Sequence, residues 1–360
     1  MRLGIIGLPN SGKTTIFNAL TGQKLETGAV TTGQFEVHTA VVNVPDARLD
    51  QLIALFQPKK ATYATITYAD IAGLDKGISE GGLKGQFRNE LSQVDGFVHV
   101  VRAFESDIVP HPYGSVDPAR DVSIIDGEFL LEDMATVEKR LTKVRDEIRI
   151  KGKKLEAQYA DEIALLERMQ AHLEAEKPLR DFELTAEQEK SLRGFGFLTL
   201  KPVLIVLNMG DEAQDPDSLL TYPHQHSAIV GLQGKLEAEL AQLDDPDDVA
   251  MFMEEYGITE LSRDKVIRLS YELMGIQSFF TVGKDECRAW TIPVGATAPE
   301  AAGAIHSDLQ RGFIRAEVMN YQDLLDAGSE AEVKNQGKMH LEGKDYIVQD
   351  GDIVHIKFNV

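Results

Sequence analysis

The sequence predicts an α/β protein built on a mostly parallel, doubly wound sheet, with an inserted helical hairpin and a smaller α+β domain at the carboxy end. Three observations support this prediction. Short apolar runs alternate with helical patterns over residues 1–125 and again around residues 200–230. A heptad stripe fills the interval between these two regions, and short strand patterns crowd residues 277–360.

The strand candidates of the main sheet are apolar runs bounded by turns. They read RLGIIG, ATITYADIAG, GFVHVV, KPVLIVLN and HSAIV, and helical patterns such as KTTIFNAL separate them. Apolar strands separated by helices are typical of a parallel sheet that is covered on both faces.

The inserted segment shows a helical period. Apolar residues recur at alternate spacings of four and three, and they are Leu130, Met134, Val137, Leu141, Val144 and Ile148. Gly152 interrupts this stripe, which resumes at Tyr159 and continues to Leu173. We expect two helices that meet near Gly152 and pack antiparallel. An extended coiled-coil dimer is the alternative, but each arm holds only about three heptads, which favours a hairpin.

The carboxy-terminal region has the pattern of a small α+β module. The runs SFFTVG, RAWTIPVG, FIRAEVMN and DYIVQDGDIVHIKF read as strands, the last of them as a hairpin that turns at Asp350-Gly351, and APEAAGAIHSDL reads as a helix. We therefore predict three domains: a split α/β domain at 1–125 and 198–276, a helical insertion at 126–197, and the small domain at 277–360.

Composition narrows the class of protein. The 360 residues carry a formal net charge of −21, so no overall attraction to DNA or to an anionic membrane is expected. A single cysteine, Cys287, excludes an internal disulfide and fits a reducing compartment. No apolar run reaches the roughly 18 residues of a membrane span. We expect a cytoplasmic protein without membrane contact.

The stretch GLPNSGKT near the amino terminus matches the pattern G-x-x-x-x-G-K-[ST]. It follows a predicted strand and precedes a helical pattern, the context that a phosphate-binding loop requires. Glycine lets backbone N–H groups converge on phosphate oxygens, Lys13 neutralises their charge, and Thr14 offers a hydroxyl to Mg²⁺. The sequence thus predicts a nucleoside triphosphate contacted by Asn10, Ser11, Gly12, Lys13, Thr14 and Thr15.

A second motif, Asp70-x-x-Gly73, ends a predicted strand. In GTPase-like domains this carboxylate holds Mg²⁺ and the glycine N–H reaches the γ-phosphate, so Asp70 joins Thr14 as a candidate metal residue. Lys13 and Gly73 are the candidate catalytic residues. Leu74 stands where Ras-type enzymes place the glutamine that orients water, and a hydrocarbon cannot do this. We expect slow hydrolysis unless another group replaces it.

A third motif, Asn208-x-x-Asp211, follows the run VLIVL. It resembles the base-reading pattern N-K-x-D with Met209 in place of the lysine, although a polar turn after a strand is the plain alternative. Ser227-Ala228 stands where we expect the last base-side loop.

These motifs, the hairpin and the terminal module together resemble the Obg-like ATPase (YchF) family over essentially the whole chain. GLPNSGKTTIFNAL, AWTIPVGATAPEAAGAIHSD and DYIVQDGDIVHIKFNV are the most specific stretches. The resemblance implies a P-loop NTPase of the translation-factor-related class with a carboxy-terminal TGS domain, a β-grasp fold like that of ubiquitin. It also implies ribosome binding and a preference for ATP over GTP.

Two positions depart from the family pattern. The family usually carries Asn-x-x-Glu, whereas Asp211 here could accept hydrogen bonds from guanine, so ATP is favoured but GTP is not excluded. The switch threonine of the family aligns with Gln34; Thr31 and Thr32 lie close by, and we assign Thr32 as the third metal residue. Asn10 is a candidate for holding K⁺ beside the phosphates, with a plain loop-stabilising hydrogen bond as the alternative.

The hairpin turn is basic in an acidic chain. Residues 138–154 hold eight basic residues against three acidic ones, a local excess that could bind RNA or the ribosome. The alternative is pairing with the acidic return arm, which carries Glu156, Asp161, Glu162 and Glu167. Two further functions stay open: a GTP-specific GTPase in ribosome assembly, and a scaffold that binds nucleotide with negligible hydrolysis.

Overall fold

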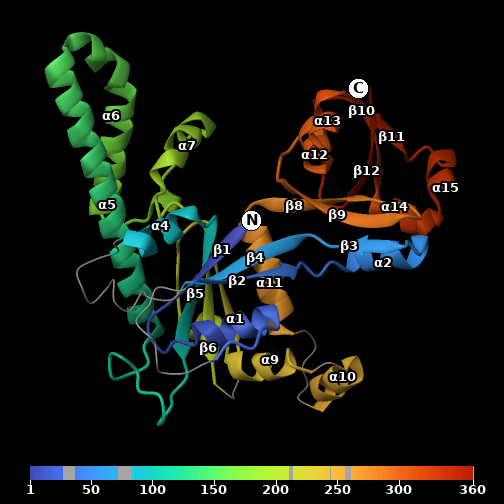
Figure 1. The fold of residues 1–360 in the computed structure, drawn as a ribbon, viewed down its shortest axis with the longest axis horizontal. Helices are drawn as coiled ribbons and strands as arrows, with labels where there is room; N and C mark the ends of the chain where they lie inside the picture. The colour runs from blue at the N-terminus through green and yellow to red at the C-terminus, as the bar shows by residue number, and fades with distance from the viewer. Residues whose placement is uncertain are drawn as a thin grey trace. The chain divides into compact units, whose positions relative to one another are not determined.

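The computed structural model describes residues 1–26, 37–71, 83, 85–210, 214–243, 245–255 and 261–359. Their contacts divide the chain into two compact units (Figure 1). Unit 1 comprises Met1–Val41 and Thr67–Val266, and unit 2 comprises Val42–Ile66 and Ile267–Val360. No helix among the described residues is both long enough and apolar enough to cross a membrane.

Unit 1 is built on a six-stranded sheet in the order β2-β4-β1-β5-β6-β7. Its strands are β1 Arg2–Ile6, β2 Val37–Asn43, β4 Thr65–Ile71, β5 Gly96–Ala103, β6 Val203–Met209 and β7 Ser227–Leu232. The pairs β1–β4, β1–β5, β5–β6 and β6–β7 are all parallel. Every residue of β6 is buried, as expected for a central strand covered on both faces. The predicted doubly wound α/β fold is confirmed.

Helices cover both faces of this sheet. On one face α4 (Gly85–Gln93) and the first turns of α5 (Pro118–Lys151) contribute Phe87, Leu91, Val122, Ile125 and Phe129 to a core shared with the strands. The helix α1 (Lys13–Thr21) buries Ile16 and Phe17, and it packs against α9 (Gly234–Leu240). The remaining helices of this unit are α7 Ala186–Leu192, α8 Pro216–Leu219 and α10 Pro246–Glu255, while α11 Ser262–Leu273 leads into unit 2.

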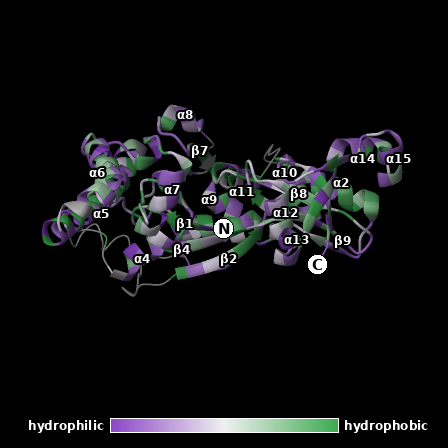
Figure 2. Cartoon of the chain, turned by 90° about the horizontal axis from the view of Figure 1, so that it is seen from above, coloured by the Kyte–Doolittle hydropathy of each residue, from purple (hydrophilic) through white to green (hydrophobic). Residues whose placement is uncertain are grey.

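The predicted helical hairpin is confirmed. The helices α5 and α6 (Lys153–Glu174) meet at Gly152, whose positive φ of 87° is one that glycine adopts without strain. Their seam buries Val137, Leu141, Leu166, Met169 and Leu173. Figure 2 shows both helices carrying hydrophilic and hydrophobic residues side by side, as amphipathic helices do.

The chain returns from the hairpin through η1 (Leu179–Asp181), α7 and η2 (Arg193–Phe195). Asp133 of α5 is fully buried and binds the end of this returning segment, at residues 198–199. Its carboxylate accepts hydrogen bonds from the backbone N–H groups of Leu198 (2.9 Å) and Thr199 (2.7 Å) and from the Thr199 hydroxyl (2.7 Å). The continuous helix α5 therefore packs on the sheet with its first turns and forms one arm of the hairpin with the rest of its length.

Unit 2 contains a second six-stranded sheet in the order β11-β10-β12-β8-β9-β3. Its strands are β3 Lys60–Thr62, β8 Ile276–Thr281, β9 Glu286–Pro293, β10 Phe313–Asn320, β11 His340–Glu342 and β12 Asp352–Phe358. Its helices are α2 Ala47–Phe56, α12 Ala298–Ile305, α13 Ser307–Arg311, α14 Tyr321–Ala327 and α15 Glu330–Asn335. The core lies between the sheet and α12, where Ala298, Ala301 and Ala302 meet Phe279 and Val354.

The last predicted hairpin is wrong in detail. Only β12 forms after residue 342, and Ile347 makes a single isolated bridge to Thr297. The reason is a side chain: the buried carboxylate of Asp352 accepts from the Gln349 N–H (2.8 Å) and the Tyr346 hydroxyl (2.7 Å). These two bonds close a loop where the sequence pattern suggests a strand.

Residues 42–66 belong to unit 2, although the sequence places them with the α/β domain. The strand β3 adds to the edge of the second sheet, parallel to β9. The Arg48 guanidinium pairs with Asp350 (2.7 Å) and with Asp46 (2.8 Å) and lies over the Phe280 ring. The predicted domain limits themselves stay a prediction.

Candidate functional site

The site begins where β1 gives way to α1. Residues 7–12 form the connecting loop, and α1 starts at Lys13. Gly12 is left-handed with a φ of 93°, and a Cβ there would overlap the Asn208 side chain. A Cβ on Gly7 would overlap the Val100 carbonyl oxygen. Both glycines of the predicted motif are thus required by conformation or by space.

Lys13 places its charge directly at this loop. The Lys13 Nζ donates to the carbonyl oxygens of Leu8 (2.8 Å) and Gly7 (3.1 Å). The ammonium is therefore oriented by the backbone that a phosphate would approach, at the amino end of a helix whose dipole also favours an anion.

Thr14 and Asp70 form an oxygen-donor pair beside the lysine. The Thr14 hydroxyl donates to Asp70 Oδ2 at 2.9 Å, and Asp70 is 3% exposed at the end of β4. Burial raises the pKa of the Asp70 carboxyl, while the Thr14 bond and the charge of Lys13 oppose this rise. Within the described ranges no three or more His, Cys, Asp or Glu side chains gather into a metal site. A cation here would need phosphate or water oxygens as further ligands, which is how proteins usually hold Mg²⁺.

Asn208 joins three segments of the site. Its Nδ2 donates to the Ser11 carbonyl (2.9 Å), and its Oδ1 accepts from the Gly234 N–H (3.2 Å). The side chain is 4% exposed, and a Cβ on Gly234 would come within 2.6 Å of its Oδ1. The carboxamide thereby ties the phosphate-binding loop to the segment that follows β7.

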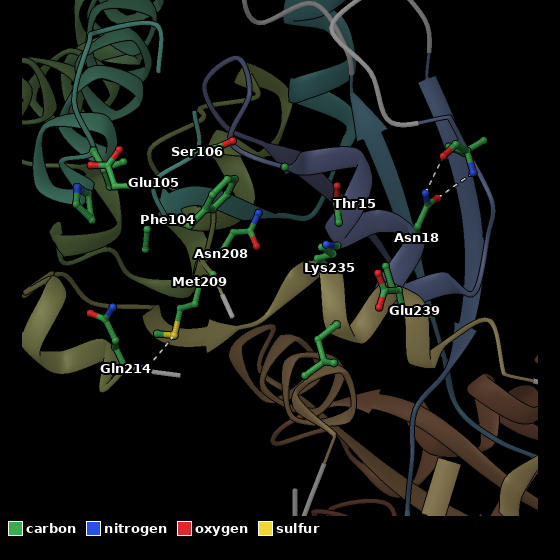
Figure 3. Close-up of a pocket in the computed structure, with 18 of the residues that line it drawn as sticks. Thr15, Asn18, Phe104, Glu105, Ser106, Asn208, Met209, Gln214, Lys235 and Glu239 are labelled. Atoms are coloured by element: carbon green, nitrogen blue, oxygen red, sulfur yellow. Dashed lines mark hydrogen bonds between the residues drawn. The ribbon is translucent and has the colours of Figure 1, made fainter. Parts of the chain in front are cut away.

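A cavity of about 1330 Å³ opens at this junction. Figure 3 shows Asn208 and Met209 with Phe104, Glu105 and Ser106 to one side and Thr15, Lys235 and Glu239 to the other. The Arg102 guanidinium donates to the Phe104 carbonyl (2.9 Å) and lies 4.4 Å from the centre of its ring, so this wall is fixed. The cavity exceeds the roughly 300–1,000 Å³ of usual small-molecule sites, so it has room for a nucleotide.

Two family models match separate parts of the chain, and whole known proteins match its full length. A model described as a 50S ribosome-binding GTPase matches residues 2–122, and the YchF-GTPase carboxy-terminal model, described as a protein of unknown function (DUF933), matches residues 276–359. The chain is 43% identical to "Ribosome-binding ATPase YchF" of Bacillus subtilis, which covers 99% of both chains. The chain belongs to the YchF family. The protein of the same name from Escherichia coli O157:H7 is 40% identical, and the match covers 100% of this chain and 99% of the E. coli protein.

A solved structure supports the same membership. The Schizosaccharomyces pombe YchF GTPase has a TM-score of 0.85 and 32% identity, and the match covers 99% of this chain and 97% of that one. The family resemblance predicted from the motifs is confirmed, and the fold of both units follows that of a YchF protein.

The structure gathers most of the predicted site residues of this YchF chain. Gly12, Thr15, Asn208 and Met209 line the cavity, and the neighbouring Lys13 and Thr14 are hydrogen-bonded to the Gly7 carbonyl and to Asp70. The Ser11 hydroxyl is buried and has no partner among the described groups. Several predicted residues lie outside the described residues, and they are Thr31, Thr32, Gln34, Gly73, Leu74 and Asp211.

Ser227 and Ala228 are not part of the site. They open β7 and pair with Val203 and Leu204 at the amino end of β6, whereas Asn208 pairs with Leu232. Five residues of strand separate Ser227 from Leu232, a distance of about 16 Å. The correction has a simple reason: in a parallel sheet the site lies at the carboxyl ends of the strands. The residues that follow β7, Gly234 and Lys235, take the expected place.

Sequence reasoning also missed the segment between β5 and α5. His111 and Asp121 are both almost fully buried and pair at 2.8 Å, and the Tyr113 N–H donates to His111 Nδ1, so Nε2 carries the proton toward Asp121. The Asn10 amide donates to the Pro110 carbonyl (3.3 Å), which links this segment to the phosphate-binding loop. The sequence offers no periodic signal here, because side chains rather than a regular element fix the segment.

Proposed function

We propose that this chain is a Mg²⁺-dependent nucleoside triphosphatase that prefers ATP and associates with the ribosome. One observation carries the proposal: Lys13 is held at a glycine loop beside the Thr14–Asp70 pair, and Gly12 of the same loop lines a cavity together with Asn208. Relatives covering the full length are named ribosome-binding ATPases, which supports both halves of the proposal.

Thr14 and Asp70 fit a hard divalent cation, because a hydroxyl and a carboxylate oxygen lie 2.9 Å apart and both are oxygen ligands. Bound Mg²⁺ would neutralise charge that develops on the phosphates. Thr32 stays our proposal for its switch contact.

The reaction we propose is hydrolysis at the γ-phosphorus. Water forms the new P–O bond while the bond to the β–γ bridging oxygen breaks, which releases the diphosphate and phosphate. Lys13, the loop N–H groups and the N–H of Gly73 stabilise the developing negative charge. Leu74 cannot orient water, so we propose that the intrinsic turnover is low.

Asn10 is our proposed contact for K⁺. In the structure its amide contacts the Pro110 carbonyl, which leaves its oxygen as the available ligand atom. Turnover measured in K⁺ and in Na⁺ at equal ionic strength tests this role, and equal rates would remove it.

Base selection at Asn208 does not separate the two purines. A carboxamide has two N–H donors and two lone pairs on oxygen, and one of each is already used by Ser11 and Gly234. The remaining N–H can donate to purine N7, an acceptor that adenine and guanine share. We propose a preference for ATP because Met209 replaces the usual lysine. Calorimetric titration of nucleotide-free protein with ATP and with GTP tests the preference; tighter GTP binding would reverse it.

A GTP-specific alternative has two observations in its favour. The model matching residues 2–122 is described as a 50S ribosome-binding GTPase, and the S. pombe protein is named a GTPase. The same titration decides between the two.

We propose that the hairpin contacts RNA through its lysines. The arginines are largely engaged: Arg140 pairs with Glu162 (2.6 Å), Arg145 with Glu167 (2.7 Å) and Arg149 with Asp146 (3.0 Å). The exposed residues Lys139, Lys143 and Lys151 make no ion pair with any described group. Arg140 and Arg145 thus join α5 to the acidic return arm, Arg149 pairs within α5, and the three lysines are the groups that we propose for phosphate contact.

Charge reversal of these three lysines to Glu tests the contact by ribosome co-sedimentation. Reversal of the exposed Lys177 and Lys190, outside the tip, is the control, and it matches the charge change of the Lys139 and Lys143 pair reversed alone. The proposal requires that reversal of the tip lysines weakens ribosome binding and that reversal of the control lysines does not. The difference from wild type should be larger at low salt concentration.

We propose that the carboxy-terminal domain is a TGS domain of β-grasp type. The antiparallel pair β8–β9 is followed by α12, and β12 lies parallel to β8, which is the strand arrangement of that fold. A cytoplasmic location follows as a proposal from ribosome association and the single buried cysteine.

A further inference from the structure

Gly231 of β7 faces the side chain of Met209 on the neighbouring strand β6. A Cβ built on Gly231 would overlap Met209 Cε outright and would lie 3.0 Å from its Sδ and 3.1 Å from Pro216 Cγ. Gly231 is not among the residues with positive φ, so an alanine would be compatible with its backbone. Space, rather than backbone conformation, therefore limits residue 231: any side chain there would have to displace the end of the Met209 side chain.

Met209 fills this space in a defined orientation. The Gln214 N–H donates to its Sδ at 3.4 Å, and the residue is 5% exposed. In Figure 3 its thioether points toward Gln214 and away from Asn208. A flexible side chain is thus folded back against β7, where the Gln214 N–H contacts its sulfur.

The position of Met209 matters because it lines the cavity next to Asn208. The Asn208 side chain is held in place, because its amide nitrogen and its oxygen are both hydrogen-bonded to buried backbone groups. The width of the cavity at this end therefore depends on where the Met209 side chain lies.

We propose that Gly231 is a positioning residue for the nucleotide base: by lacking a side chain it keeps Met209 folded back, and this opens the space that a purine ring occupies. The proposal rests on the proposed nucleotide-binding function and specifies which end of the site depends on Gly231. A methyl group at 231 would displace the thioether by about 1 Å or turn it into the cavity, because real Cβ contacts are rarely shorter than 3.4 Å. Displacements of this size commonly cost large factors in binding or rate.

The test is the Gly231→Ala variant of the full chain, titrated calorimetrically with ATP and, separately, with inorganic tripolyphosphate in the presence of Mg²⁺. We expect ATP binding to weaken about tenfold or more, whereas tripolyphosphate, which has no base, stays within about twofold of wild type. The double variant G231A/M209A removes the thioether that is displaced, so its ATP affinity should return to that of Met209→Ala alone. Gly127→Ala, on α5 with no atom within 4 Å of an added Cβ, is the control for the substitution itself.

Each outcome has one reading. Unchanged ATP affinity in folded G231A overturns the proposal, as does an equal loss for ATP and tripolyphosphate, since the base end would then not be the part affected. If G231A does not fold, the double variant decides: recovery of folding with the ATP affinity of Met209→Ala supports the thioether clash, and failure to recover refutes it. Failure of wild type to bind ATP would instead overturn the proposed function, so the two failures are distinguishable.

Discussion

Asn208 is the side chain on which the geometry of the site depends most, and its removal gives the sharpest prediction. In Asn208→Ala the Ser11 carbonyl and the Gly234 N–H, both buried, lose their partners. At about 1 kcal/mol net for each bond, the arrangement that binds nucleotide loses about 2 kcal/mol. With 1.4 kcal/mol for each factor of ten, the affinity for ATP should fall about thirtyfold.

The control variant separates the two bonds. Asn208→Asp keeps an oxygen for the Gly234 N–H but loses the donor to the Ser11 carbonyl, and it brings two acceptors together at that point. We expect both variants to weaken the binding of inorganic tripolyphosphate, because the phosphate-binding loop itself is displaced, and to weaken ATP binding further, because the N–H proposed to donate to purine N7 is also lost. Calorimetric titration measures both ligands, and hydrogen exchange at the Gly234 amide should accelerate in Asn208→Ala only. An ATP affinity within threefold of wild type in the alanine variant would refute this reasoning.

Three further predictions concern other parts of the molecule. Lys13→Ala should lower kcat for hydrolysis by about 100-fold or more while the protein stays folded, which steady-state phosphate release and thermal unfolding together measure. Burial raises the pKa of Asp133 to about 6; its proton is thus held more tightly in the folded state, and its contribution to the free energy of unfolding falls by about 2 kcal/mol as pH rises from 4 to 7. The stability difference between wild type and Asp133→Asn should shrink by that amount over this range, and a difference independent of pH would contradict it. Arg48→Ala should lose about 1 kcal/mol of local stability, seen as roughly fivefold faster hydrogen exchange in β3, whereas Arg48→Lys, which keeps one bond to Asp350, should lose less.

The sequence predicts those parts of the fold that depend on local pattern. The loop from Gly7 to Thr14 combines two glycines, a lysine and a hydroxyl at fixed spacing, and each has a physical reason in the structure. The hairpin turn at Gly152 is equally local, since the apolar stripe on either side defines both arms. Such features need no knowledge of distant contacts.

Features that depend on distant contacts were not predictable in the same way. Residues 60–62 join unit 2 by pairing with a strand that begins at Glu286, and nothing in a three-residue segment indicates that partner. The misplacement of Ser227 and Ala228 differs, because the sequence did contain the answer. The apolar run continues through Leu232, so the strand ends there, and the site had to follow its carboxyl end.

Glycines around Asn208 and Met209 show how this end of the site is constructed. An added Cβ at Gly12 or Gly234 would meet the Asn208 carboxamide, and one at Gly231 would meet the Met209 thioether. Three glycines from two segments distant in the sequence, the phosphate-binding loop and residues 231–234, therefore leave space for the side chains of two consecutive residues of β6. Because these neighbours share partners, the effects of substituting them should not add, and a double variant in which the central side chain is also shortened should lose less than the sum of its parts. The base end is thus one packed unit, in which the identity of residue 209 and the absence of a side chain at 231 are a single structural requirement.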